Sequence, residues 1–240
     1  MAENLSAETK EKLMHVSVAT LATALYKRGL RNQVIQDVHP VARKGQNMVG
    51  PAFTLRYMPA REDRNTLAEF RNPMHKQRQA VEQCPPGSVL IMDCRKDARA
   101  ASSGDILITR LMVRGAAGVV TDGGFRDSMV IGELDMPAYH SRPSSPTNLT
   151  LHEAIEINGP IGCGDVAVFP GDTLVGDDDS VIVIPAHMVD EVADEAVEMT
   201  VYEDFVSEKV LEGATIIGLY PATEDKNLEL FAQWRAAKGR

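Results

Sequence analysis

The chain has 240 residues, 44% hydrophobic and 25% charged, which is typical of a globular protein with one large or two small domains. Its formal net charge of −9 disfavours nucleic-acid binding through a basic face, although an anionic small substrate needs only a local cation. The sequence contains no run of 18 apolar residues, so no membrane span is predicted. The polar N-terminus lacks a signal-peptide pattern. We therefore expect a cytoplasmic protein with neither nucleic-acid nor membrane partners.

The predicted elements of the first half alternate between helix and strand. They are, in order, a helix over 6–29, a short strand near 34–38, a strand over 48–57, a short helix over 74–83 and a strand over 88–93. Ser6 is the expected N-cap of the first helix and Gly29 its end. The segment 61–72 is highly charged and carries no regular pattern.

The second half is predicted to contain helices, short strands and a long acidic helix. The order is a helix from Gly104 to Arg114, a strand over 118–121, a turn over 122–124, a short helix over 129–134, a strand over 137–140, short strands over 161–185, and helices over 189–211 and 227–238. No internal repeat is present. The simplest interpretation is one α/β domain over residues 1–240, with a core at about 10–187 and a helical C-terminal tail at about 188–240.

Most familiar chemical signatures are missing from the sequence. The six histidines never fall at metal-binding spacings, and the three cysteines are few, odd in number and far apart, so we expect reduced, buried thiols. The acidic run 177–179 lies between two strand patterns and is expected to be a solvated turn. Lys44 and Lys96 lie in polar loops without the desolvation that a Schiff-base lysine needs.

The stretch 104–127 is the best candidate site. Ser102, Ser103 and an acid in the first turn predict a helix start, which is a favourable place for an anion. Arg126 and Asp127 follow the turn after the next strand, 22 residues beyond Gly104, a length that returns the chain to the same edge of a sheet.

This arrangement suits a 2-oxo acid. Its carboxylate would lie on the backbone amides of 104–107, Arg126 over its oxo group, and Asp127 on a hard cation. An Arg–Asp pair that only fixes the loop remains the alternative.

These residues also carry a family resemblance. The pattern GD-x-L followed by RG-x-x-G-x-V-x-DG-x-x-RD resembles the RraA-like family, which includes 4-hydroxy-4-methyl-2-oxoglutarate aldolases with oxaloacetate decarboxylase activity and ribonuclease E activity regulators. Further motifs with the family's character occur in the same order. They are VGPAFT at 49–54, PGSVL at 86–90, VFPGD at 168–172, and GDDD at 176–179 with VIVIP at 181–185.

The resemblance implies an α-β-β-α sandwich resembling the phosphohistidine swivelling domain, assembled as a homotrimer or hexamer with active sites between subunits. It implies a class II lyase that releases pyruvate with Mg²⁺ or Mn²⁺. Gly104, Asp105, Ile106 and Leu107 would then bind the pyruvyl carboxylate, and Asp105 would also hold metal-bound water. Arg126 would stabilise the enolate, and Asp127 would be the direct metal ligand.

The resemblance also implies a carboxylate from the neighbouring subunit's tail, for which Glu203 is the best positional guess. The charged segment from Arg61 to Arg78 is a candidate substrate wall, with Arg64 or Arg71 meeting a distal carboxylate, or else a solvated face. Two other functions stay open. One is a non-catalytic regulator that binds a ribonuclease or helicase, and the other is a related enolate-forming enzyme acting on a sugar-derived oxo acid.

Overall fold

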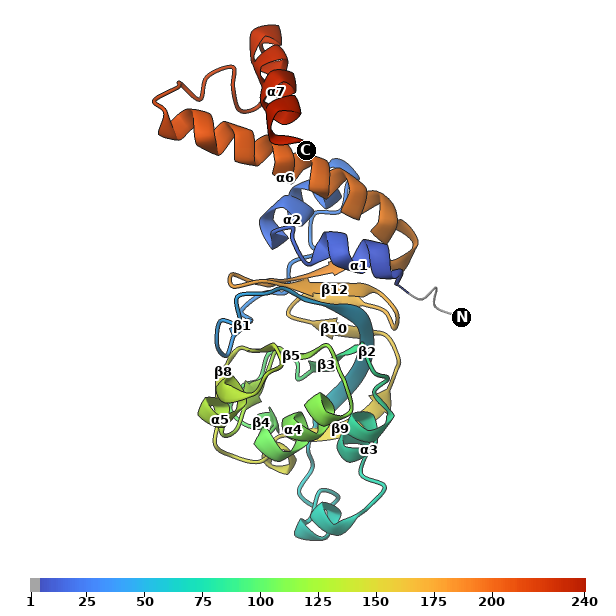
Figure 1. The fold of residues 1–240 in the computed structure, drawn as a ribbon. Helices are drawn as coiled ribbons and strands as arrows, with labels where there is room; N and C mark the ends of the chain where they lie inside the picture. Colours follow the sequence, from blue (N-terminus) through green and yellow to red (C-terminus); the bar gives the residue numbers. More distant parts are fainter. Residues whose placement is uncertain (1–4) are drawn as a thin grey trace.

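The computed structural model describes residues 5–240, and its fold is a strongly bent β-sheet with helices on both sides and a helical C-terminal arm (Figure 1). The centre of the larger sheet is parallel. Its parallel strands run in the order β7 (Ala138–His140), β5 (Gly118–Thr121), β3 (Val89–Asp93) and β2 (Met48–Pro59). β3 and β5 are buried along their whole length, which explains their near-continuous apolar sequences.

β2 is long enough to pair with different strands along its length. Its first residues pair with β12, whereas its last residues pair with β9, so that the sheet bends around it. The antiparallel additions to the sheet are β1 (His39–Pro40) beside β7, β9 (His152–Ile157) beside β2, and β12 (Thr173–Gly176) followed by β13 (Val181–Ile184).

A second, smaller sheet continues the parallel strands beyond their carboxyl ends. It contains β4 (Ala101–Ser103), β6 (Gly124–Phe125) and β8 (Arg142–Pro143), which pair in parallel in that order. In the chain they follow β3, β5 and β7 respectively. The packing is tight, because a Cβ at Gly123 would lie 2.8 Å from the Cβ of Cys94 and one at Gly124 would lie 2.5 Å from that of Ser144.

A buried carboxylate ties the two sheets together. Asp122, between β5 and β6, accepts hydrogen bonds from the backbone N–H groups of Cys94 (2.6 Å), Lys96 (3.0 Å) and Gly164 (3.1 Å). Burial raises the pKa of Asp122, and these backbone donors oppose the rise. The turn that ends β5 is thereby held against the loop that follows β3.

Helices cover the sheet in two groups. One face packs on α3 (Lys76–Gln83), α4 (Asp105–Val113) and α5 (Ser128–Glu133). The opposite side packs on the hairpin of β10 (Ile161–Cys163) and β11 (Val166–Val168). Beyond β12 and β13 lie α1 (Ala7–Leu13), α2 (Val18–Lys27) and α6 (Val189–Leu211). Short 3₁₀ turns occupy η1 (Leu67–Arg71), η2 (Asn148–Thr150) and η3 (Ala186–Met188).

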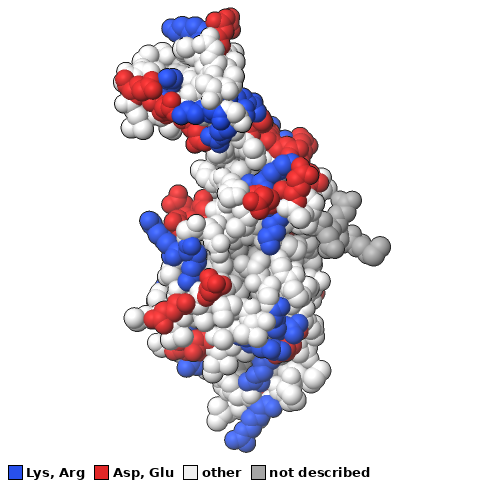
Figure 2. All heavy atoms as spheres, viewed as in Figure 1, with Lys and Arg blue, Asp and Glu red and all other residues white. Residues whose placement is uncertain are grey.

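The end of α6 and α7 (Asp225–Lys238) form an arm that extends away from the sheets (Figure 1). The arm has its own small core around buried Phe205, against which Tyr202, Phe231 and Trp234 pack. On the face in Figure 2, acidic and basic side chains interleave along α6 and the arm. Among residues 5–240, no helix is both long and apolar enough to cross a membrane.

Several predicted elements are confirmed and others need correction. The strands at 118–121 and 88–93 and the helix at 189–211 form as expected. The helix predicted over 6–29 is instead two helices, because Ser17 begins a new one by accepting from the backbone N–H of Thr20 at 3.1 Å. The strand expected near 34–38 is reduced to an isolated bridge between Val34 and Ile182.

The mixed α/β class and the helical tail are confirmed by the observed elements. The single domain over 1–240 and the likeness to the swivelling domain stay predictions, and residues 1–4 lie outside the described part of the chain. The acidic run is a turn as expected, since the Asp177 carboxylate accepts from the backbone N–H groups of Asp179 (2.9 Å) and Ser180 (3.0 Å). The three cysteines are free and buried.

Candidate active site

A pocket of about 320 Å³ opens where the small sheet meets the start of α4. All predicted residues of the stretch 104–127 line it, whereas Glu203, Arg64 and Arg71 do not. Its wall consists of Phe70, Gln77, Arg78, Ala101, Ser103, Gly104, Asp105, Ile106, Leu107, Arg126, Asp127, Thr147 and Asn148. The pocket thus lies beyond the carboxyl ends of parallel strands, where open α/β sheets usually bind ligands.

The start of α4 forms one wall of the pocket. Its N-cap is Gly104 rather than a serine, since Ser102 and Ser103 belong to β4. Gly104 has no side chain with which to cap the helix, and the first backbone bond into it is donated by Ile108. The preceding helical amides, including those of Asp105 and Leu107, therefore have no intrahelical acceptor. These amides and the positive end of the helix dipole lie at the pocket.

Arg126 and Asp127 follow β6 directly. Asp127 is the N-cap of α5 and adopts the left-handed conformation (φ 52°, ψ 38°), yet its carboxylate does not cap that helix. Such a conformation in a non-glycine residue costs about 1–3 kcal/mol and is frequent at functional sites. The strained backbone therefore places the carboxylate on the pocket wall rather than on its own helix.

The two side chains do not form a tight pair. The Arg126 Nε and an Asp127 carboxylate oxygen are 3.9 Å apart, whereas a charge-assisted hydrogen bond spans about 2.7–2.9 Å. Each side chain is 47% exposed. A pair whose only purpose was to fix the loop would make the shorter contact, so this geometry leaves both groups available to a ligand.

Backbone pairing brings the two halves of the site together. The backbone N–H of Arg126 donates to the carbonyl of Ser103 at 3.0 Å, beside the start of α4. A Cβ at Gly104 would lie 3.5 Å from the Cβ of Arg126 and 3.6 Å from an Asp127 carboxylate oxygen. The loop after β6 and the helix start therefore share one wall.

The donor set fits a hard cation that keeps most of its water. Among residues 5–240 no group of three or more histidine, cysteine or acidic side chains forms a protein cage for a metal. The pocket offers two carboxylates, from Asp105 and Asp127. Mg²⁺ is commonly held in this way, by one or two carboxylates together with substrate and water.

Two further wall residues, Arg78 and Asn148, carry polar chemistry. Arg78 is the last residue of the charged segment that the sequence offered as a substrate wall, whereas Asn148 was not predicted. Arg78 lies on α3, the helix between β2 and β3, and Asn148 lies in η2, after β8. Both segments follow strands that end at the same edge of the sheets, and that topological position was the available signal. The earlier candidates Arg64 and Arg71 are exposed and lie outside the wall.

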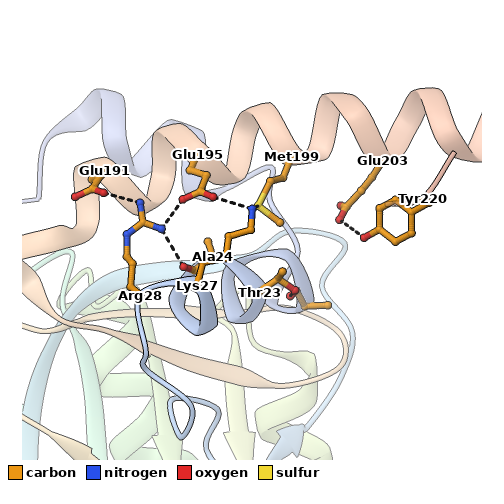
Figure 3. Close-up of polar contacts among 10 residues, drawn as sticks. Thr23, Ala24, Lys27, Arg28, Glu191, Glu195, Met199, Glu203 and Tyr220 are labelled. Atoms are coloured by element: carbon orange, nitrogen blue, oxygen red, sulfur yellow. Dashed lines mark hydrogen bonds and ion pairs between the residues drawn. The ribbon is translucent and has the colours of Figure 1, made fainter. Parts of the chain in front are cut away.

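Glu203 lies away from the pocket of its own chain. On α6 its carboxylate accepts from the hydroxyls of Thr20 (2.8 Å) and Tyr220 (3.3 Å), near the ion pairs that join α2 to α6 (Figure 3). The two lysines are also elsewhere. Lys96 pairs with Asp165 at 2.7 Å, which raises the pKa of Lys96, the opposite of what a Schiff-base lysine requires.

A larger hollow of about 640 Å³ lies between α1, the part of β2 around Pro51 and the loop around Pro86. Lys10 is its only charged wall residue among those the structure describes. A ligand site is defined by convergent polar groups as well as by size, and these converge at the pocket beside Arg126.

Known proteins resemble this chain in sequence and in fold. A family model described as RraA-like, Aldolase/RraA, matches residues 18–183. A protein of Halalkalibacterium halodurans named "Putative 4-hydroxy-4-methyl-2-oxoglutarate aldolase" is 31% identical over 168 residues, which cover 70% of this chain and 73% of that protein. Protein DlpA of Legionella pneumophila is 23% identical over 206 residues, 86% of this chain and 32% of that longer protein.

A solved structure extends the similarity to the fold. Streptomyces coelicolor RraAS2, described as an unusual member of the RNase ES inhibitor RraA protein family, superposes with a TM-score of 0.74 at 28% identity. The superposition covers 85% of this chain and 97% of that one. The chain therefore belongs to the RraA-like family.

Proposed function

We propose that the protein is a divalent-metal-dependent lyase that cleaves a carbon–carbon bond of a 2-oxo acid and releases pyruvate. The proposed reactions are a retro-aldol cleavage like that of 4-hydroxy-4-methyl-2-oxoglutarate aldolases and the decarboxylation of oxaloacetate. The observation that carries the proposal is the convergence of uncapped α4 amides, Arg126 and Asp127 on one pocket. The family and its aldolase-named relative support the same chemistry.

Each part of the pocket has a proposed task. The amides of Asp105, Ile106 and Leu107 bind the carboxylate of the 2-oxo acid, because uncapped helix amides favour an anion. Asp127 would hold Mg²⁺ or Mn²⁺ directly, and Asp105 would hold a water molecule bound to the metal. The metal would supply Lewis-acid polarisation of the oxo group. Arg126 stabilises the negative charge that develops on the oxo oxygen as the bond breaks.

Loss of one such preorganised donor typically costs about 10²–10³ in kcat. The expected result for Arg126→Ala is therefore a loss of turnover of that size, because the charge developing on the oxygen loses its partner. Asp127→Ala is expected to lose metal binding as well as activity. Matched controls are Arg64→Ala and Asp135→Ala, two exposed residues outside the pocket wall.

The test is a pyruvate-release assay over a panel of 2-oxo acids, oxaloacetate first, with Mg²⁺ or Mn²⁺. Chelation is expected to abolish turnover, and borohydride with substrate is expected not to trap the protein, since neither Lys44 nor Lys96 lines the pocket. Activity that survives exhaustive metal removal, or wild-type rates in both pocket variants, would show that the proposal is wrong.

The proposal includes a homotrimer or hexamer in which a neighbouring subunit's Glu203 completes the site. Mixing Glu203→Gln with Arg126→Ala protein tests this directly. If the site is shared, mixed oligomers contain some sites with neither substitution, and activity returns in part. Mixtures that remain as inactive as the separate variants would assign the whole site to one chain.

A second candidate is a regulator that inhibits a ribonuclease without chemistry of its own, and the likeness to RraAS2 favours it. The discriminating measurement is cleavage of RNA by a purified ribonuclease E-type enzyme in the presence of this protein. Inhibition that is equal for wild type and Arg126→Ala, together with no pyruvate release, would establish the regulator. Pyruvate release that is lost in Arg126→Ala would establish the lyase.

A further inference from the structure

Two arginines line the pocket, and only Arg126 has a place in the proposed chemistry. The second, Arg78, lies on α3 and is half-buried. Within residues 5–240 its guanidinium makes one hydrogen bond, from Nη1 to the carbonyl of Asn72 at 3.0 Å, and it forms no ion pair with an acidic side chain. A guanidinium that makes one hydrogen bond and no ion pair keeps N–H donors that an anionic ligand can use.

The position of Arg78 is fixed by its neighbours. The adjacent Gln77 is buried, and its Nε2 donates to the carbonyl of Ser102 in β4, a carbonyl that also accepts from the Tyr57 hydroxyl at 2.8 Å. The start of α3 is therefore tied to the strand that leads into Gly104. The bond to Asn72 holds one arm of the guanidinium and leaves its remaining N–H groups without a described acceptor.

Asn148 adds a neutral donor to the same wall. Its side chain is 5% exposed, and its oxygen accepts from the hydroxyl of Thr147 at 3.2 Å. Its amide nitrogen has no partner among the described residues. A buried donor that lacks a protein partner and lies on the pocket wall is available to an acceptor atom of a ligand.

From this geometry we infer that Arg78 is a specificity-determining residue that binds a second anionic group of the substrate, at the end away from the 2-oxo acid. The inference rests on the proposed function, whose two named substrates both carry a second carboxylate, and it assigns the binding of that carboxylate to Arg78. A guanidinium presents a planar fork that matches carboxylate and phosphate groups, and the N–H groups left free on Arg78 serve that purpose.

The inference is tested by equilibrium binding to the full chain in Mg²⁺, with two acids of equal length. 2-Oxoglutarate carries a terminal carboxylate where 2-oxopentanoate carries a methyl group, so their affinity ratio isolates the second anion. We expect wild type to prefer 2-oxoglutarate by about 10- to 100-fold, as for a hydrogen-bonded charged group. 2-Oxo-4-phosphonobutanoate then shows whether a phosphonate replaces the carboxylate.

In Arg78→Gln the preference is expected to fall below about 3-fold, with the affinity for 2-oxopentanoate unchanged. Arg78→Lys, which keeps the charge and loses the fork, is expected to lie between the two. Arg64→Gln, an exposed control outside the wall, is expected to keep the wild-type ratio. Circular dichroism and Tm are measured for every variant, so that misfolding is recognised.

Three outcomes would each overturn the inference. Wild type could show no preference for 2-oxoglutarate, the preference could survive in Arg78→Gln, or Arg64→Gln could lose the preference to the same extent. The result is separable from the proposed function. A preference that depends on Arg78 without any pyruvate release would keep the inference and remove the lyase. Pyruvate release with equal kcat/KM for monoanionic and dianionic substrates would keep the lyase and remove the inference.

Discussion

The N-cap of α4 offers a sharp test of the carboxylate site, because one substitution is expected to stabilise the helix and weaken the ligand. In Gly104→Ser the new hydroxyl can accept from the helix amides at N2 or N3, as serine N-caps do. Gly104 already has the extended backbone of an N-cap (φ −131°, ψ 176°), and a Cβ there meets no atom closer than 3.5 Å. The serine thus fits without rearrangement and competes with the substrate for the same amides.

The magnitudes follow from this competition. Serine exceeds glycine at an N-cap by only a few tenths of a kcal/mol, so Tm is expected to rise by about 1 °C. A hydrogen bond to a charged group contributes about 1.5–3 kcal/mol, so loss of one amide to the hydroxyl is expected to raise KM about 10- to 100-fold.

Gly104→Ala separates the hydroxyl from the added bulk. It brings a Cβ without an acceptor, and alanine is a poor N-cap, so we expect a loss of about 0.5–1 kcal/mol of stability with KM within a few-fold of wild type. Initial-rate kinetics and thermal unfolding are measured for both variants. An unchanged KM in Gly104→Ser, or an equal rise in both variants, would refute the idea that these amides bind the substrate carboxylate.

Three further predictions concern stability and reactivity. Phe205→Ala is expected to cost about 3–5 kcal/mol, and fluorescence of Trp234, the only tryptophan, should then report unfolding of the arm at lower urea than circular dichroism reports for the sheets. Arg99 lowers the pKa of Asp97 to about 2, so this pair stabilises the fold above about pH 4 and the benefit disappears as the pH falls towards 2. The free-energy difference between wild type and Arg99→Gln should therefore be below about 1 kcal/mol at pH 7 and vanish near pH 2, and a difference independent of pH would contradict this. Burial raises the pKa of the Cys84 thiol to about 12 and those of the other two cysteines also, so a disulfide reagent at pH 8 should modify none of them until denaturant is added.

The sequence predicted best the elements whose pattern is long or wholly apolar. The helix at 189–211 repeats its apolar residues over six turns, and the buried strand at 118–121 lies between Gly115 and Gly123. Strands of two or three polar residues carry no such pattern. Ser102 and Ser103 were therefore interpreted as the start of a helix, although they form β4 by pairing with a segment 22 residues away.

The residues of the candidate site also differ in how well the sequence predicted them. Gly104, Arg126 and Asp127 were found because they lie within one short stretch whose length returns the chain to one edge. Arg78 was indicated only as the end of the charged segment from Arg61, for which a solvated face was the alternative. Only the bond from Gln77 to Ser102 places it on the wall, and such a tertiary contact leaves no local pattern.

The small sheet of β4, β6 and β8 has a consequence for how such a protein changes over time. Its strands are aligned by main-chain bonds, including the one from Arg126 to the Ser103 carbonyl, and main-chain bonds do not depend on which side chains the strands carry. Side chains at the mouth of the pocket can consequently be replaced while the backbone positions that carry them keep their alignment. A frame of this kind allows related chains to carry different side chains at this pocket while the fold stays the same.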